Sequence, residues 1–450
     1  MRIVIAGLGA AGLAAVMAAR RADPDAEILV IDNKPFDLLH TCGLPFAVQG
    51  DIAPVDRLKA HLQLERMRAE LVRPCRVTEI DAKRQIVTSV SLDTGREISG
   101  PYDKLILCLG ARPRVPAGIE GLARLLALAA DPTAFCMASA EDAQNLRGRA
   151  LPGVRAVVAG AGPVGLEIAA ALRRLECRVT LLEQMEHPLP AALDWDMARP
   201  VNAYLAEIGV DLRCGAALER VMGADRVESV MVNGEILDTE LLALAAGCEP
   251  RTDAARAAGA QVDDHGIVVN QRMETSLPNV YAAGDCARAV SLIDGRPIHA
   301  RLASIAWAQG AAAGANAAGA DESYPGATGA FVSRIGDIEA SSAGYTAAQA
   351  VDAGYEPVSG RLADTTAPVW HPGALPVSVK VVACARTRRV IGAQAVGQAG
   401  AMWRVNVASA AMAAGMTLEQ LARLEFAYCP ALSHTDDPLA RAARQALRKL

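Results

Sequence analysis

The sequence predicts an α/β protein with two doubly wound, Rossmann-like domains and a smaller α+β domain at the C-terminal end. Two segments, residues 2–32 and 155–183, each run in the order strand, glycine-rich loop, helix, strand and acidic residue. This order is typical of a dinucleotide-binding βαβ unit. The last quarter of the chain alternates strand-like and helix-like segments. A chain of 450 residues is too long for one core, so two or three domains are expected.

The first unit starts with a short apolar run at residues 2–6, which predicts a buried parallel strand. The glycines that follow have separate tasks. Gly7 permits a tight turn, Gly9 lets a pyrophosphate approach the backbone, and Gly12 lets helix and strand pack closely. The next strand ends at Asp32, twenty residues after Gly12, where a carboxylate can accept hydrogen bonds from a ribose.

The second unit repeats this pattern with Gly160, Gly162 and Gly165, and its second strand ends at Glu183. Two dinucleotide sites in one chain most simply mean that one dinucleotide is held permanently and the other is exchanged. An acidic residue favours a free ribose 2′-hydroxyl, and the residues at 184–186 include no arginine for a 2′-phosphate. We therefore expect NADH rather than NADPH as the exchanged dinucleotide.

Several segments outside the two units mark the course of the chain. Apolar strands at 105–109 and 241–247 predict the points where the chain leaves the first domain and returns, and Gly110 opens the turn after the earlier strand. Asp285 follows another predicted strand, either as a functional carboxylate or as part of a simple turn. The Ala/Gly-rich residues 310–320 are expected to be a linker into the third domain.

One cysteine is set apart from the other nine by its surroundings. Cys42 lies at a turn, and Pro45 can open a short helix whose N-terminal end would favour a thiolate. His40 either assists this thiol or faces solvent. The remaining cysteines are interpreted as small buried hydrophobic residues. This pattern makes Cys42 the candidate redox thiol.

Composition excludes several classes of function. A net charge of −5, a pI near 5.9 and 4% aromatic residues argue against nucleic-acid binding. No apolar run is long enough for a membrane span. The ten cysteines show neither CxxC nor paired-ligand spacing, so we expect reduced thiols and no metal site. The chain begins directly with a strand and without a signal peptide, and a cytoplasmic protein is expected.

Taken in order, these segments resemble the pyridine nucleotide–disulfide oxidoreductases with a glutathione-reductase-like fold. The resemblance spans essentially the whole chain and rests on the two glycine loops, Cys42-Gly43-Leu44-Pro45, Gly110-Ala111-Arg112-Pro113, Tyr281–Asp285 and Phe426-Ala427-Tyr428-Cys429-Pro430. A single cysteine in place of a CxxxxC pair is similar to one branch of this family. That branch holds coenzyme A disulfide reductase, NADH oxidase and NADH peroxidase.

The resemblance implies a discontinuous FAD-binding domain (1–113 and 245–320), an NAD(P)H-binding domain (114–244) and a dimerisation domain (321–450) of a homodimer. It implies FAD binding by a set that comprises Gly7, Gly9, Gly12, Asp32, Gly110 and Asp285. It implies NADH binding by Gly160, Gly162, Gly165 and Glu183. Cys42 would be the catalytic thiol, and Tyr428 of the partner subunit would reach the active site. Tyr428 or His434 would supply a proton, unless they are ordinary core and surface residues.

Three functions are considered. The first is NADH-dependent reduction of a disulfide or persulfide, similar to coenzyme A disulfide. The second is an NADH oxidase or peroxidase, but Ala10 stands where those enzymes carry a histidine. The third is a flavoprotein subunit that passes electrons to a protein partner. Leu38, Thr41 and Trp370 depart from the coenzyme A disulfide reductase pattern, so the identity of the acceptor stays open.

Overall fold

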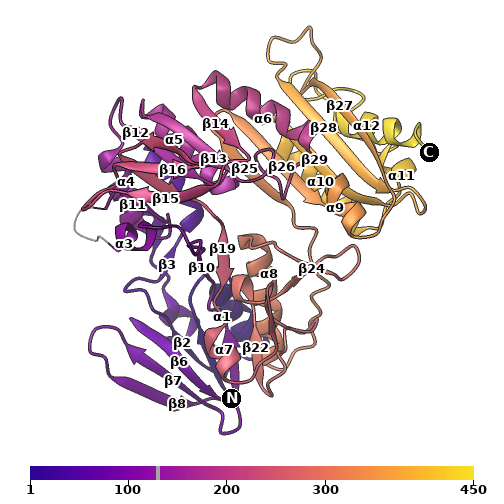
Figure 1. Cartoon of the computed structure of the whole chain (residues 1–450). Helices are drawn as coiled ribbons and strands as arrows, with labels where there is room; N and C mark the ends of the chain where they lie inside the picture. The colour runs from indigo at the N-terminus through magenta and orange to yellow at the C-terminus, as the bar shows by residue number, and fades with distance from the viewer. Residues whose placement is uncertain (128–131) are drawn as a thin grey trace. The chain divides into compact units, whose positions relative to one another are not determined.

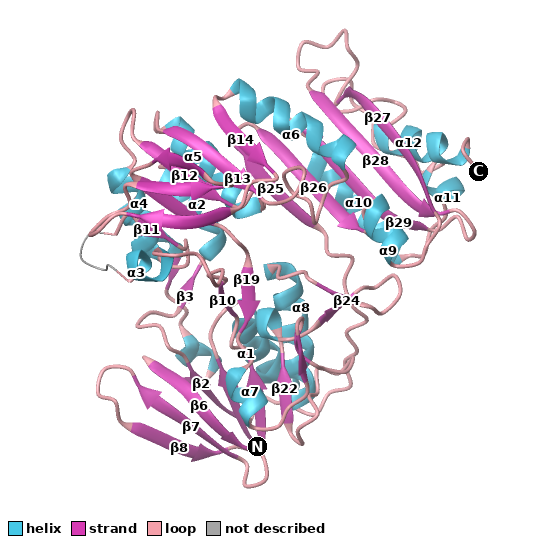
Figure 2. Cartoon of the chain, viewed as in Figure 1, coloured by secondary structure: helices cyan, strands magenta, loops and turns pink. Residues whose placement is uncertain are grey.

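The computed structural model describes residues 1–127 and 132–450 (Figures 1 and 2). These residues form two compact units. The first consists of Met1–Thr41, Asp56–Arg112 and Cys248–Gly329, and the second of Cys42–Val55, Pro113–Gly247 and Ala330–Leu450. The two glycine loops therefore belong to different units. The three-domain division drawn from the sequence stays a prediction.

The first unit is built on a five-stranded parallel sheet. Its strand order is β22 (Val280–Ala282), β9 (Lys104–Leu107), β1 (Arg2–Ala6), β2 (Glu27–Ile31) and β5 (Ala69–Val72). Every neighbouring pair in this sheet is parallel. Since the carboxyl ends of parallel strands meet at one edge, the loop after β1 and the turn after β22 come from the same edge of the sheet.

Each face of this sheet has its own core. Ile3, Ile5 and Val30 face helices α1 (Ala10–Ala22) and α8 (Ala303–Ala317). The alternate residues Val4 and Ala6 face helix α7 (Asp253–Ala257) and an antiparallel sheet. That sheet consists of β6 (Cys75–Asp81), β7 (Ile86–Ser91) and β8 (Glu97–Pro101). The apolar run at residues 2–6 is continuous because both faces are covered.

The predicted linker at 310–320 is wrong, because most of it belongs to helix α8. This helix packs closely along α1. A Cβ atom on Gly310 would lie 2.2 Å from the Ala11 carbonyl oxygen, and one on Gly314 would lie 2.2 Å from that of Ala15. The Ala/Gly composition therefore reflects a close contact between two helix backbones, which larger side chains would prevent.

The second unit contains another five-stranded parallel sheet. Its order is β11 (Ala134–Phe135), β18 (Leu241–Leu244), β12 (Arg155–Ala159), β13 (Arg178–Glu183) and β14 (Val210–Cys214). Antiparallel strands β15 (Leu218–Met222), β16 (Ser229–Val232) and β17 (Glu235–Asp238) form a separate sheet. The helices of this part are α2 (Leu44–Gln49), α3 (Leu122–Leu126), α4 (Ala140–Arg149), α5 (Pro163–Arg174) and α6 (Trp195–Glu207). The β12–α5–β13 segment repeats the β1–α1–β2 segment of the first unit.

The C-terminal part of the second unit is an antiparallel sheet with helices packed on it. The strand order is β25 (Phe331–Ile335), β26 (Ile338–Gly344), β29 (Val390–Gly397), β28 (Pro376–Cys384) and β27 (Pro357–Thr365). The helices are α9 (Ala347–Asp352), α10 (Ala401–Ala413), α11 (Leu418–Leu421) and α12 (Pro438–Leu447). Two parallel Rossmann-like sheets and a C-terminal α+β part confirm the predicted fold class.

Short strand pairs complete the description. They are β3 (Leu38–Leu39) with β4 (Lys59–Ala60), β10 (Ala111–Pro113) with β19 (Cys248–Pro250), β20 (Val262–Asp263) with β21 (Gly266–Ile267), and β23 (Ala289–Val290) with β24 (Pro297–Ile298). In the described parts of the chain, no helix combines the length and the hydrophobicity that a membrane span requires.

Candidate functional site: two glycine loops and an exposed thiol

The glycines of the first loop are required by its geometry. Gly7 has φ +105°, and a Cβ atom there would lie 2.1 Å from the carbonyl oxygen of Cys108. A Cβ atom on Gly12 would lie 2.0 Å from the Gly7 carbonyl oxygen. A Cβ atom on Gly9 would have no neighbour within 4 Å among the residues that the structure describes. Gly7 and Gly12 are therefore needed by the fold itself, whereas Gly9 leaves an open backbone surface before helix α1.

The Asp32 carboxylate holds the first glycine loop in place through hydrogen bonds. It accepts hydrogen bonds from the backbone N–H of Leu8 at 2.5 Å and from the Lys34 ammonium at 2.6 Å. Lys34 Nζ also donates to the Leu8 carbonyl oxygen at 3.3 Å. The Asp32 side chain is only 3% exposed. The carboxylate thus fixes the shape of the loop, a role that was not predicted from the sequence, and its contact with a ribose stays a prediction.

The second loop repeats these contacts. Gly160 has φ +109°, and a Cβ atom there would lie 2.4 Å from the Ala245 carbonyl oxygen. A Cβ atom on Gly165 would lie 1.8 Å from the Gly160 carbonyl oxygen, while one on Gly162 would meet nothing within 4 Å. The buried Glu183 carboxylate accepts from the backbone N–H groups of Ala161 at 2.9 Å and Met185 at 3.0 Å. The two loops are therefore equivalent in structure as well as in sequence.

Asp285 lies in a 3₁₀ turn, Gly284–Cys286, where the first turns of α1 and α8 converge. A Cβ atom on Gly284 would lie 2.8 Å from that of Ala11 and 3.5 Å from that of Ala306. Gln309, buried in α8, accepts a hydrogen bond from the Gly284 N–H at 2.9 Å. Burial raises the pKa of Asp285, and the positive charge of Arg301 opposes that rise. Gln309 was not predicted from the sequence, because its partner Gly284 lies 25 residues away.

Gly110 opens the turn between β9 and β10. It has φ +69°, a Cβ atom there would have no neighbour within 4 Å, and its carbonyl oxygen accepts from the Arg251 N–H at 3.0 Å. The next arginine, Arg112, is held by Glu249 at 2.5 Å and Asp253 at 2.9 Å. This turn lies where the chain leaves the first unit. The binding of a cofactor by Gly110 stays a prediction.

Cys42 is one of two exposed cysteines, the other being Cys429. It lies in a 3₁₀ turn, Thr41–Gly43, that leads directly into helix α2. Pro45 is in the first turn of α2, as the sequence predicts. His40 is exposed, which agrees with the solvent-facing alternative. The thiol is therefore accessible, and its position depends on how α2 is held.

Tyr428 and His434 lie on the segment between α11 and α12, on different elements from Cys42. The Tyr428 side chain is 50% exposed. His434 Nε2 is 3.0 Å from the Thr365 carbonyl oxygen, so this nitrogen carries the proton and donates it. A carboxylate oxygen of Asp364 lies 3.9 Å from the same nitrogen. His434 is thus fixed to the end of β27, whereas Tyr428 is available to solvent.

Glu167 is a further ionisable group beside the second loop, two residues after Gly165. Its carboxylate accepts a hydrogen bond from the Ser333 hydroxyl at 2.8 Å. Burial raises the pKa of Glu167 from 4.5 to about 7, although the hydrogen bonds from Ser333 and from the Arg334 backbone lower it. The helix that begins at the second glycine loop therefore carries a carboxyl group whose pKa, about 7, lies near neutral pH.

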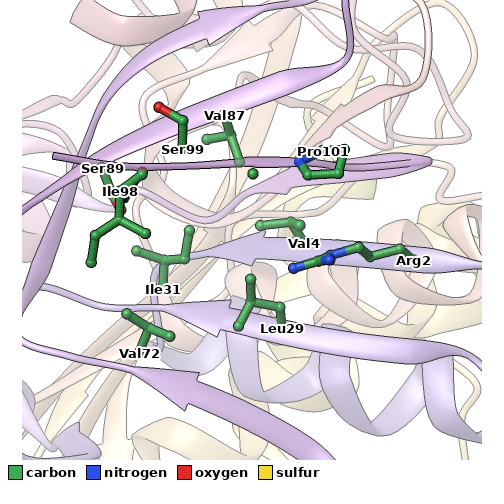
Figure 3. A pocket seen from close by; sticks show the side chains of 11 residues that line it. Arg2, Val4, Leu29, Ile31, Val72, Val87, Ser89, Ile98, Ser99 and Pro101 are labelled. Carbon is green, nitrogen blue, oxygen red and sulfur yellow. Dashed lines mark hydrogen bonds between the residues drawn. The ribbon is translucent and has the colours of Figure 1, made fainter.

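Two cavities lie away from the glycine loops. One, of about 90 Å³, lies between the parallel sheet and strands β7 and β8, and its walls are mostly apolar (Figure 3). It is too small for a nucleotide, since ligand pockets usually exceed about 300 Å³. The other, of about 480 Å³, is lined by Arg155 and Arg178 at the amino ends of β12 and β13, whereas the Gly160 loop follows the carboxyl end of β12.

Comparison with known proteins agrees with this geometry. Residues 1–310 match the family described as pyridine nucleotide-disulphide oxidoreductase, and residues 333–437 match its dimerisation domain. An NADH oxidase of Methanocaldococcus jannaschii is 32% identical over 100% of this chain and 99% of its own length. A CoA-dependent NAD(P)H sulfur oxidoreductase of Pyrococcus abyssi is 31% identical over 98% and 97% of the two chains.

A solved structure of similar sequence has the same fold. The NAD-dependent persulfide reductase from A. fulgidus superposes with a TM-score of 0.93 and is 33% identical. The superposition covers 100% of this chain and 83% of that protein. The family resemblance inferred from the sequence is therefore confirmed over the whole chain.

Proposed function

The chain belongs to the pyridine nucleotide-disulphide oxidoreductases, and on this premise we propose that it reduces a sulfur–sulfur bond with electrons from NADH through the Cys42 thiol. Membership of the family confirms the predicted class, an oxidoreductase enzyme. The observation that carries the proposal is the exposed Cys42 at the start of α2, in a chain that also has two dinucleotide loops. The relatives named above, a sulfur oxidoreductase and a persulfide reductase, support it.

The first loop would hold FAD. Gly9 offers the cradle that a Cβ atom would fill, and the N-terminal turns of α1 and α8 provide positive dipole ends beside it. These features fit a pyrophosphate. The proposed set is Gly7, Gly9, Gly12, Asp32, Gly110 and Asp285. Bound FAD would accept a hydride from a nicotinamide and pass an electron pair to sulfur.

The second loop would bind NADH. Gly160, Gly162 and Gly165 would hold the pyrophosphate at the start of α5, and Glu183 would lie beside the adenosine ribose. The residues after Glu183 are Gln184, Met185 and Glu186, which offer no cation to a 2′-phosphate. NADPH is therefore the less suitable donor.

The proposed sulfur chemistry takes place at Cys42. The thiolate attacks one sulfur of the acceptor, so that a mixed disulfide or persulfide forms and the other sulfur leaves as a thiol with a proton. Two electrons from NADH, passed on through the flavin, would then break the new sulfur–sulfur bond, which restores the Cys42 thiolate and releases the second sulfur as a thiolate that takes up a proton from water. Tyr428 of the partner subunit would donate the proton to the leaving thiol. His434 is a weaker candidate, because its Nε2–H already donates to Thr365.

We further propose that the enzyme is a cytoplasmic homodimer. The match of residues 333–437 to a dimerisation domain supports the dimer. All ten cysteines lie in the described residues and none of them forms a disulfide there, which fits a reducing compartment. Nucleic acids and membranes are not expected as partners, and a protein electron acceptor would be needed only if small acceptors fail.

The proposal is tested with a panel of acceptors and a matched pair of cysteine variants. Purified enzyme is assayed with NADH and coenzyme A disulfide, coenzyme A persulfide, polysulfide, peroxide or oxygen. Sulfur acceptors are expected to give the fastest turnover. Cys42→Ser should keep the reduction of flavin by NADH and lose turnover of the sulfur acceptor, whereas Cys429→Ser keeps both. Normal turnover by Cys42→Ser would exclude the thiol mechanism, and faster turnover with oxygen or peroxide would indicate an oxidase.

A further inference from the structure

Helix α2, which directly follows Cys42, is capped by a side chain that lies about a hundred residues away in sequence. Arg147, in the last turn of α4, donates a hydrogen bond from Nη1 to the Val48 carbonyl oxygen at 2.6 Å. Gly50 ends α2 with φ +101°. A Cβ atom on Gly50 would lie 2.7 Å from Arg147 Nη1, so the guanidinium group packs directly against this glycine.

A second contact holds the same end of α2. Asp51 pairs with Arg174, the last residue of α5, at 3.3 Å. Helix α2 packs against both α4 and α5, all three within the second unit (Figure 2). Helix α5 begins at Pro163, directly after Gly162 of the second dinucleotide loop. The helix that follows the thiol therefore packs against the helix that begins at that loop.

We propose that Arg147 is a positioning residue for the Cys42 thiol. The inference rests on the proposed role of Cys42 and adds a residue that does not touch the reacting atoms. Helix α2 has only six residues, too few to be stable alone, so its orientation depends on its neighbours. The Arg147 guanidinium satisfies a terminal carbonyl and complements the negative end of the helix dipole. Only Gly43 stands between Cys42 and the first residue of α2. If Arg147 no longer holds the C-terminal end of α2, the short helix changes its orientation and the thiol at its other end moves with it.

Four variants of the full chain with bound FAD separate positioning from general stability. Arg147→Met keeps the apolar stem and loses the donor. Arg147→Lys keeps one donor and serves as the conservative rescue. Gly50→Ala adds a methyl group where the guanidinium group lies, and so displaces it without changing Arg147 itself. Arg173→Met is the matched control, because Arg173 donates to the Ile208 carbonyl oxygen at 2.8 Å from the neighbouring position of α5.

Two measurements are made on each variant. The first is hydrogen exchange of the backbone amides across residues 42–52. The second is a pair of half-reactions in rapid mixing, the reduction of flavin by NADH and the reoxidation of the reduced enzyme by coenzyme A disulfide or polysulfide. Arg147→Met and Gly50→Ala are expected to raise exchange and to slow reoxidation roughly tenfold, with flavin reduction unchanged, since misplacement of a reacting group by about 1 Å costs up to ~100-fold. Arg147→Lys should recover part of both, and Arg173→Met should change neither.

Unchanged exchange and unchanged reoxidation in Arg147→Met would overturn the inference, as would an equal effect of Arg173→Met. Exchange that rises without any slowing of reoxidation would also overturn it, because α2 would then move without consequence for the thiol. If the wild-type enzyme is not reoxidised by either sulfur probe, the proposed function has failed. Exchange would still show in that case whether Arg147 holds the segment of Cys42.

Discussion

The two glycine loops are built from the same internal contacts, but their surroundings differ. Ala11 in α1 and Val164 in α5 occupy equivalent positions after the two loops. Ala11 is buried against Gly284 and Gly310, whereas Val164 is 44% exposed. The first loop is also braced by Lys34, which bridges Asp32 and the Leu8 carbonyl oxygen. Among the described residues, the Glu183 carboxylate at the second loop accepts from two backbone N–H groups, those of Ala161 and Met185, and it forms no salt bridge there.

A second difference lies three residues further along each helix. Ala14 of α1 is 2% exposed and lies in a helix that packs tightly against α8. The equivalent position of α5 is Glu167, which reaches Ser333 in the C-terminal part of the chain. An enclosed and braced loop suits a ligand that stays bound, and a more open loop suits one that leaves after each turnover. The difference therefore supports a resident FAD at the first loop and an exchanged NADH at the second.

The largest effects are expected from Gly7→Ala and Gly160→Ala. Both add a Cβ atom within 2.4 Å of a backbone carbonyl oxygen at a positive φ, where only glycine is unstrained. Each should destabilise its own unit by about 3 kcal/mol or more. Gly7→Ala should abolish FAD binding, and Gly160→Ala should keep FAD and lose NADH binding. Flavin absorbance and NADH titration measure the two outcomes. The assignment of the loops would be reversed if Gly160→Ala alone were colourless.

Asp32→Asn and Glu183→Gln test the difference in bracing. In each variant an amide replaces a carboxylate whose two oxygens both accept hydrogen bonds, so one N–H group faces another donor at a cost of about 1–3 kcal/mol. Asp32→Asn also removes the charge that pairs with Lys34. We expect the larger loss of unfolding free energy in Asp32→Asn and a raised KM for NADH in Glu183→Gln. Equal losses in a denaturant titration would mean that Lys34 contributes nothing to the loop.

Glu167→Gln tests the difference between the two helices as a function of pH. The pKa of Glu167 is raised from 4.5 to about 7, so the folded protein binds the proton more tightly than the unfolded chain does. Stability from this group is therefore complete below pH 4.5, falls as the pH rises towards 7, and is lost above it, with a span of at most roughly 3 kcal/mol. The glutamine variant still accepts from Ser333 and should remove this slope. Denaturant unfolding at pH 5 to 8 measures it, with Glu97→Gln on exposed β8 as the control. A slope that persists in Glu167→Gln would place the titrating group elsewhere.

Local patterns predicted the parts of this fold that depend on neighbours in sequence. The bounds of β1 and β2 follow from apolar runs that end at Gly7 and Asp32, and the same reasoning located the second loop. Helix α8 was missed because its alanines and glycines are selected by contact with α1, about 300 residues earlier. The contact of Arg147 with α2 could not be predicted from the sequence either, since an arginine at a helix end predicts a solvated charge. The hydrogen bonds from the loop backbones to Asp32 and Glu183 could have been predicted, because each carboxylate ends a buried strand at the edge of the sheet where the loop turns.

The smallest effects on the fold are expected from Gly9→Ala and Gly162→Ala, and they test most directly whether the loops bind ligands. Neither Cβ atom would have a neighbour within 4 Å, and neither glycine has a positive φ. The free energy of unfolding of the ligand-free protein should therefore change by less than about 0.5 kcal/mol. If the open surfaces are occupied by a pyrophosphate, the same methyl group prevents close approach of the backbone. Gly9→Ala should then weaken FAD binding alone and Gly162→Ala should raise the KM for NADH alone, each by about tenfold or more, as measured by flavin release and initial rates. Unchanged affinities in both variants would mean that the loops do not hold dinucleotides in the proposed way, because these two positions have no other task in the structure that a methyl group would disturb.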